Sequence, residues 1–559
     1  MHSALAVPEL CTLICNALSN ATYGKERSAS LLSLSLVSHL WNEIALPVLW
    51  EELHDMTPLL CLLPGDAWKI VRYYQLIYHA LLCSNLTISG KVLRRKLRRA
   101  DWASFRKYAI FVKSLVLKPE VSPRDQRRIA QCWSPGVPTL PKLRKLRIHI
   151  RKELRVDFLS LFFSASTTAL TVSDIGFWPA VHWQDLLLSC PNLSMVTMSR
   201  WSDTAAGIYL YAELARALRS GSHALTSVSV ALHIPYSGEL IRALASCPAL
   251  ESLHLELIEE EANDDPISAA NIPYPSFQSL RELTLNTIPM ALLRTVIISG
   301  PKLRLTEIYA STRHLYTQDD LVQTMAAIAE KCNRSALSSL TLDCNTDAIV
   351  VQNGRTDRRV VLRKDVLAPI AAFSGLSHLY IEGITDVEID DAEWEVIAHW
   401  WPELELFNVQ GFTNTYCPIT AILPFSQACP RLKSLSLPVD ATILQEVCED
   451  GPPLQVDAGA SPPRLTLDVG FSRIRESDPV NTARWLVQTI PGLKDIEFDG
   501  TGLAYERVDL ETLDWEVYRE RHNAWILVRD LVKAKIHGCA PPENYYLDDD
   551  EDKESCDSA

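Results

Sequence analysis

Cysteine and histidine are the residue types through which this 559-residue chain could do chemistry, and the sequence holds 14 of each. Cys11 and Cys15 lie four residues apart, which would place both thiols on one face of a helix. No CxxC pair or histidine cluster accompanies them, so the ligand spacing of a zinc site is incomplete and we expect no metal. Both sit within apolar runs, a position typical of small buried residues in a reducing compartment.

Three of the cysteines that directly precede proline stand at the end of a segment with helical periodicity. They form the pairs Cys190-Pro191, Cys247-Pro248 and Cys429-Pro430. Because proline ends a helix, these positions favour buried residues at a helix end over nucleophiles.

The short motifs of common catalytic sites are missing from the sequence. There is no Gly-rich phosphate loop, HExxH, GxSxG or paired metal-ligand cluster. His254 and His378 fall on expected strands with no nucleophile beside them. We therefore expect neither an enzyme nor a cofactor, with a catalytic site assembled from distant parts of the chain as the open alternative.

Charge is distributed unevenly along the chain. Residues 1–155 carry 24 Lys and Arg against 11 Asp and Glu, whereas the rest carry 30 against 57, and the formal net charge is −14. This acidic balance argues against a general nucleic-acid partner. Glu9 interrupts the first apolar stretch and no apolar run reaches membrane-spanning length, so we expect no membrane partner and a cytoplasmic or nuclear location, or both.

The first fifty residues predict three short helices. Pro8 and Glu9 suit a first helical turn, because proline lacks an amide hydrogen that would be unpaired there and a carboxylate favours the positive end of the helix dipole. A polar interval over 19–30 separates this helix from an apolar run over 31–41, and a third helix is expected over 44–50. Helices this short cannot bury their apolar surface alone, so that surface should contact a partner.

Residues 7–50 resemble the F-box motif, from Pro8-Glu9-Leu10 to the closing Leu49-Trp50, with Val7 where the family has leucine. The resemblance implies docking on a Skp-type adaptor, and through it a cullin-RING ubiquitin ligase. The alternative is that these residues are merely one end of the main core. The expected adaptor-binding face consists of Val7, Pro8, Leu10, Ile14, Leu34, Val37, Trp41 and Ile44.

Residues 101–117 resemble the segment that follows the F-box in fungal, basidiomycete-type F-box proteins. Within it Trp102, Phe105 and Ala109 are spaced as one helix face. The basic stretch just upstream, 91–100, could be a nuclear-import signal or an RNA contact. We favour a solvated helix face on which Leu93 and Leu97 point inward.

The remainder of the chain repeats the pattern L-x-x-L-x-L at intervals of 25 to 32 residues over much of its length. Each unit pairs a short strand with a more helical segment, which predicts a parallel sheet on the inner face of a solenoid and helices outside. The units resemble the leucine-rich repeats found behind F-boxes. They begin at Leu143, Leu193, Leu225, Leu250, Leu280, Leu337, Leu376, Leu404, Leu432 and Leu493, with Val112 as a first member and Leu303 as a degraded one.

The predicted fold class is therefore α/β, a three-helix F-box followed by an irregular leucine-rich-repeat solenoid. Acidic, proline-rich insertions at 259–276 and 447–464 are expected to be surface loops. The predicted domains are an F-box-like helical domain (1–54), a basic helical linker (55–110), the solenoid (111–505), a capping helix (506–537) and an acidic disordered tail (538–559).

The expected function is substrate recognition within an SCF-type ubiquitin ligase, with an unknown protein as substrate. The alternative is a non-ligase interaction scaffold. In the repeat pattern, residues flanking the fourth and sixth positions point out of the inner sheet, and acids outnumber bases there, so a bound segment should carry Lys or Arg. Tyr380 is the best single aromatic anchor. The expected substrate-binding residues are His254, Glu282, His378, Tyr380, Glu382 and Asn408.

Overall fold

The computed structural model divides the chain into two compact units, Met1–Ser279 and Leu280–Ala559. The division falls inside the segment 111–505, which the sequence predicts as one array. The structure describes residues 7–21, 24–73, 88–118, 121–133, 138–149, 154–175, 183–201, 205–220, 224–232, 237–257, 272–312, 317–344, 360–410, 415–444, 464–470, 472–475, 477–490, 492–498 and 515–537.

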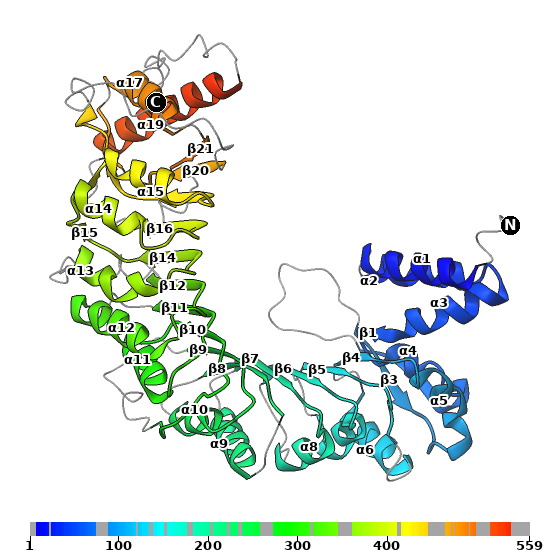
Figure 1. The fold of residues 1–559 in the computed structure, drawn as a ribbon. Helices are drawn as coiled ribbons and strands as arrows, with labels where there is room; N and C mark the ends of the chain where they lie inside the picture. The colour runs from blue at the N-terminus through cyan, green and yellow to red at the C-terminus, as the bar shows by residue number, and fades with distance from the viewer. Residues whose placement is uncertain are drawn as a thin grey trace, which may run out of the picture. The chain divides into compact units, whose positions relative to one another are not determined.

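Three helices open the first unit, as predicted: α1 (Pro8–Ala21), α2 (Gly24–Ser35) and α3 (His39–Glu51), drawn in dark blue in Figure 1. Two predicted boundaries are wrong. The first is the polar interval, because α2 begins inside it. The second is the start of α3, which lies at His39, five residues earlier than expected. Ser38 caps the helix there by accepting a hydrogen bond of 3.3 Å from the backbone N–H of Trp41.

The chain then forms the first strand of a sheet, which ends one residue before the predicted end of the helical domain at residue 54. Strand β1 (Glu52–Leu53) pairs in parallel with β4 (Ser114–Leu117), so the helical domain ends in a piece of the array's own sheet. Short helices α4 (Thr57–Leu60) and α5 (Ala103–Ala109) occupy part of the segment between them.

The predicted helical linker is wrong at 68–73 and at 88–93, where β2 (Trp68–Tyr73) and β3 (Ile88–Leu93) form an antiparallel pair. The basic stretch that follows is not a helix up to Arg98, yet Leu93 and Leu97 are buried as predicted. Arg95 lies between Asp66 and Asp101 and donates hydrogen bonds to both carboxylates, at 2.8 and 2.6 Å.

Repeats of strand and helix make up the rest of the first unit. Hydrogen bonding in register connects β4 to β9 in chain order, all in parallel. The apolar positions of the repeat are buried beneath the helices, which lie along one side of these strands (Figure 1). The strands are β5 (Lys145–His149), β6 (Ala169–Ile175), β7 (Met195–Trp201), β8 (Ser227–Leu232) and β9 (Ser252–Leu257), and the helices are α6 (Pro123–Cys132), α7 (Val156–Leu159), α8 (Trp183–Ser189), α9 (Ala205–Ser220) and α10 (Ser237–Ala245).

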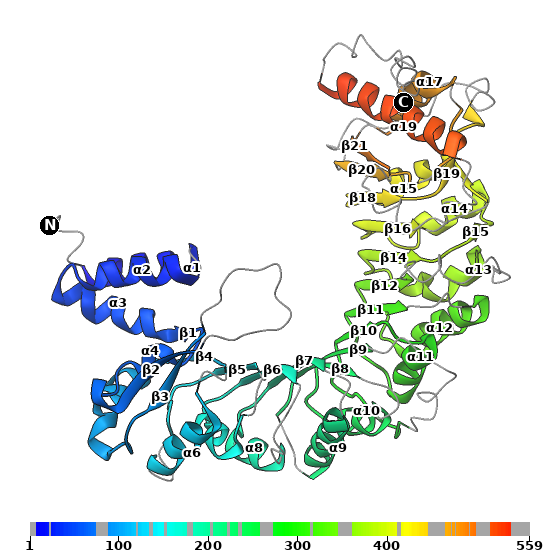
Figure 2. The same ribbon diagram turned by 180° about the vertical axis from the view of Figure 1, so that it is seen from behind.

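The second unit continues the same architecture, again with parallel strands paired in chain order and helices along one side (Figure 2). Its main-sheet strands are β10 (Glu282–Asn286), β11 (Glu307–Thr312), β12 (Ser339–Cys344), β14 (His378–Glu382), β16 (Leu406–Gln410), β18 (Ser434–Ser436), β20 (Leu465–Asp468) and β21 (Leu493–Glu497). The helices include α11 (Met290–Ser299), α12 (Gln318–Lys331), α13 (Lys364–Leu367), α14 (Asp391–Ala398), α15 (Ile422–Ala428) and α17 (Pro479–Thr489).

Two repeat strands, β6 and β20, lie where the sequence analysis placed none. Each falls inside a gap of 50 or 61 residues between consecutive pattern matches, roughly twice the ordinary interval. Short two-stranded sheets, absent from the predicted pattern, also form: β13 (Val361–Leu362) with β15 (Asp386–Val387), and β17 (Cys417–Pro418) with β19 (Val439–Asp440).

The predicted capping helix is present as α19 (Trp515–His537), which packs against α17 and β21. Residues 506–514, the tail 538–559 and most of the two insertions lie outside the described residues. In the part of the chain that the structure describes, no helix combines the length and apolar character needed to cross a membrane.

Candidate protein-interaction surfaces

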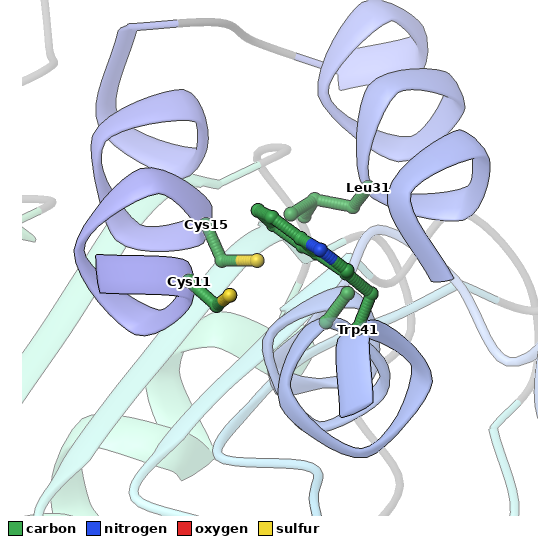
Figure 3. Packing of buried hydrophobic residues seen from close by; sticks show 5 residues of the cluster. Cys11, Cys15, Leu31 and Trp41 are labelled. Carbon is green, nitrogen blue, oxygen red and sulfur yellow. The ribbon is translucent and has the colours of Figure 1, made fainter. Parts of the chain in front are cut away.

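The three N-terminal helices have a small core of their own, shown in Figure 3. Cys11 and Cys15 from α1 face Leu31 from α2 and Trp41 from α3, with Ala45 completing the cluster. Trp41 is only 3% exposed, so its predicted place on an exposed adaptor-binding face is wrong. Trp41 instead lies in the core between the three helices. Ile14, Leu34 and Ile44, also predicted for that face, are partly buried and pack against this core.

Arg27 from α2 ties the helices together by hydrogen bonds. Its guanidinium donates to the Ser19 hydroxyl of α1 at 2.8 Å and to the Val48 carbonyl of α3 at 3.2 Å. Arg27 is buried, and Glu52 lies 3.9 Å from it as a counter-ion. A buried arginine paired in this way fixes the three helices relative to each other.

Part of the predicted adaptor-binding face is open to solvent. Val7 is 39% exposed, Leu10 is 41% and Val37 is 52%, and Pro8 is also exposed. Sequence analysis missed three other exposed leucines, although Leu13 follows Leu10 at helical spacing. We call the exposed valine and leucine residues of this region the aliphatic set; its members are Val7, Leu10, Leu13, Leu32, Leu36 and Val37.

The predicted substrate-binding residues are distributed over both units. His254 lies on β9 of the first unit, half-buried, where burial lowers the pKa of its imidazole and nearby Glu256 opposes that effect. The remaining five lie on the sheet of the second unit. Glu282 and His378 are exposed, whereas Tyr380, Glu382 and Asn408 are half-buried.

Strand register brings part of this set together. Tyr380 on β14 is paired with Asn408 on β16 and with Thr341 on β12, and Thr341 is paired in turn with Tyr309 on β11. Sequence analysis missed Tyr309 as a site residue. The sequence pattern places the degraded repeat at Leu303, but the strand register aligns Ile308 and Ala310 with the fourth and sixth positions of the pattern. The repeat therefore starts at Leu305, and Tyr309 falls in the same row as Tyr380.

Hydrogen bonds link both tyrosines to carboxylates on this face. Tyr309 donates to Asp343 Oδ2 at 3.1 Å, and Tyr380 donates to Glu382 Oε2 at 3.0 Å. Burial, together with the neighbouring negative charges, raises the pKa of both phenols above the usual range. Both hydroxyls therefore stay protonated at neutral pH and act as donors.

The cysteine-proline junctions are confirmed as buried helix ends. Cys190, Cys247 and Cys429 are at most 5% exposed. Burial raises the pKa of the Cys247 thiol to about 11 and that of Cys429 to about 12, so the reactive thiolate is disfavoured. No group of three or more His, Cys, Asp or Glu among the described residues is arranged to hold a metal ion.

Comparison with known proteins does not place the chain in a family. No family model matches the sequence, and no curated protein matches it. Solved structures similar to it include an internalin, InlF, from Listeria monocytogenes (13% identity, TM-score 0.28), with the match covering 67% of this chain and 80% of that one. The Rad7 and Elc1 complex of yeast gives 15% identity, a TM-score of 0.32 and coverage of 72% and 88%. The functional domain of InlJ from Listeria monocytogenes gives 10% identity and a TM-score of 0.25, and the match covers 67% of this chain and 55% of that one.

The chain has an α/β architecture, with parallel strands in the repeats and a helix-rich N-terminus.

Proposed function

We propose that the chain is the substrate-recognition subunit of an SCF-type cullin-RING ubiquitin ligase, acting in the cytoplasm, the nucleus or both. Residues 7–51 would dock on a Skp-type adaptor, and the sheet faces of the repeats would bind the target protein. The F-box resemblance supplies the identity of the adaptor.

The observation that supports this proposal most directly is the aliphatic set. The core formed by Cys11, Cys15, Leu31, Trp41 and Ala45 is closed without these side chains, which leaves them available to a partner. Large apolar side chains exposed on or directly beside two short helices, α1 and α2, favour a protein contact over solvent. Their spread over α1 and α2 suits a partner that contacts both helices.

The test is co-purification of a Skp-type adaptor with the double variant Leu10→Asp, Val37→Asp. We expect loss of the adaptor, because each aspartate would be buried without a counter-ion in a dry contact. The matched control is Leu188→Asp on α8, an exposed leucine, 70% accessible, outside the helical domain. Adaptor capture that is equal for the double variant and the control would refute the docking surface.

The second candidate is an interaction scaffold that never contacts an adaptor. The observation that favours it is that the parallel strands of the repeats place polar side chains on the sheet face away from the helices. Its signature would be target binding by the wild-type chain with no adaptor or cullin in the same complex.

A further inference from the structure

Four polar side chains converge on the sheet face of the second unit, away from its helices. Ile308 and Ala310 on β11 are fully buried under the helices, so Tyr309 between them points to the opposite face. The same alternation turns Tyr380 outward on β14, between buried Leu379 and Ile381. The row Tyr309–Thr341–Tyr380 thus places two aromatic side chains on either side of a small residue, each about 4.8 Å from it across the sheet.

The carboxylates of Asp343 and Glu382 stand two residues further along β12 and β14. Each accepts one phenol hydrogen bond, at 3.1 and 3.0 Å. Burial raises the pKa of Tyr380 most, and Glu382, Asp343 and Tyr309 raise it further, so all three groups lie within electrostatic reach of the Tyr380 hydroxyl. We call these four residues the tyrosine-carboxylate cluster.

Asp343 has acceptor capacity that the described residues leave unused. A carboxylate offers about four lone-pair sites, and the Tyr309 hydroxyl is the hydrogen-bond donor to Asp343 among the described residues. No Lys, Arg or His of the described chain forms an ion pair with Asp343. Beside Tyr380 in register, the carboxamide oxygen of Asn408 is inaccessible to solvent and accepts no hydrogen bond from a described residue.

The surrounding face adds negative charge. Glu282 and Glu307 are paired across β10 and β11 and are both exposed. On the row through these residues, Ser339 and then His378 follow on β12 and β14. A cationic ligand would therefore be attracted to the row of Glu282 and Glu307 as well as to the cluster.

We propose that the tyrosine-carboxylate cluster of Tyr309, Asp343, Tyr380 and Glu382 binds the guanidinium group of an arginine in an extended segment of the target protein. Arginine fits better than lysine, because its planar fork presents five N–H donors to carboxylate oxygens while its faces stack on aromatic rings. The inference deepens the proposed function by naming the chemistry of the target, and it rests on that function only for the claim that the bound segment is a ligase substrate.

The probe is a library of randomised, extended 12-residue peptides, selected by display on the intact chain. We expect the selected peptides to share an arginine, and replacing it with citrulline or lysine should weaken binding about tenfold or more, as the loss of charge-assisted hydrogen bonds implies. Asp343→Asn keeps side-chain shape and should give the same loss. The matched control is Glu330→Gln on α12, which removes one charge from a side chain 72% exposed.

Adaptor co-purification, measured on the same variants, separates the two proposals. Loss of arginine peptides with retained adaptor supports the cluster within a ligase. If the wild-type chain binds arginine peptides but captures no adaptor, the proposed arginine site is supported and the proposed ligase function is refuted. Selected peptides without arginine, equal binding of the citrulline peptide, or equal binding by Asp343→Asn and Glu330→Gln would each overturn the cluster.

Discussion

The indole nitrogen of Trp525 in α19 donates a hydrogen bond of 3.0 Å to the backbone carbonyl of Ser472, in the turn that follows β20. Both residues are almost completely buried, at 1% and 0% exposure. This contact attaches the C-terminal helix to the last repeats and covers their apolar end, which a stacked array requires for solubility.

Trp525→Ala should lower the free energy of unfolding by about 3–5 kcal/mol, because it removes a large buried side chain and leaves a cavity. Trp525→Phe should cost less and isolates the hydrogen bond. Urea unfolding followed by circular dichroism measures both. Ile536→Ala on the same helix, 41% exposed, is the control and should change little. Equal stability of Trp525→Ala and this control would mean that α19 is not a cap.

Two N-terminally truncated chains, one that begins at residue 50 and one that begins at residue 55, should differ in stability. The longer one keeps β1, whose pairing with β4 is reinforced by the backbone bond from Lys113 to Glu51 at 2.8 Å and by the ion pair of their side chains at 3.1 Å. The shorter one loses this strand and leaves β4 as an open edge. Thermal unfolding should show a lower midpoint and more aggregation for the shorter chain. Identical curves would contradict a structural role for β1.

Trp41→Ala should destabilise the three N-terminal helices by about 3–5 kcal/mol, whereas Leu10→Ala should stay within about 0.5 kcal/mol. The reason is burial, since Trp41 is in the core and Leu10 is on the surface. Amide hydrogen exchange of residues 8–51 reports this local stability without requiring the repeats to unfold. Similar exchange rates in the two variants would place Trp41 outside the core.

The Cys247 thiol should make stability fall at alkaline pH. Burial raises its pKa from 9.0 to about 11 in the folded chain, so between these values the folded state holds a proton that the unfolded state has lost. The stabilisation is complete below pH 9 and is lost as the pH rises towards 11. Urea unfolding of the wild type and of Cys247→Ala at pH 8, 9 and 10 measures the difference, which should shrink as the pH rises. A difference that is constant with pH would contradict the shift.

Alkylation gives an independent check on the cysteines. Exposed Cys61 should react with iodoacetamide in the native chain, and Cys247 should react only after unfolding, as peptide mass spectrometry can show. Rapid native labelling of Cys247 would mean that its helix end opens.

The repeated strands follow from the sequence, because the three apolar positions of a regular L-x-x-L-x-L unit are buried. Leu143, Leu146 and Ile148 illustrate this, with at most 1% exposure each. At β6 and β20 the strand register puts Thr167 and Arg464 in place of the first leucine of the pattern, whereas the fourth and sixth positions are apolar and buried. A pattern that requires an apolar residue at all three positions therefore misses these two strands.

By itself the sequence determined the start of α1 at Pro8, the inward direction of Leu93 and Leu97, and the burial of the cysteine-proline junctions, because each depends on local chemistry and polarity. Only the tertiary structure decided that Trp41 closes a core while Leu13 remains exposed, and that Tyr309 joins the row of Tyr380. Both leucine and tryptophan are apolar at helical spacing, so sequence cannot say which of them meets another helix. Strand register depends on long-range hydrogen bonding, and that is fixed only when the repeats stack.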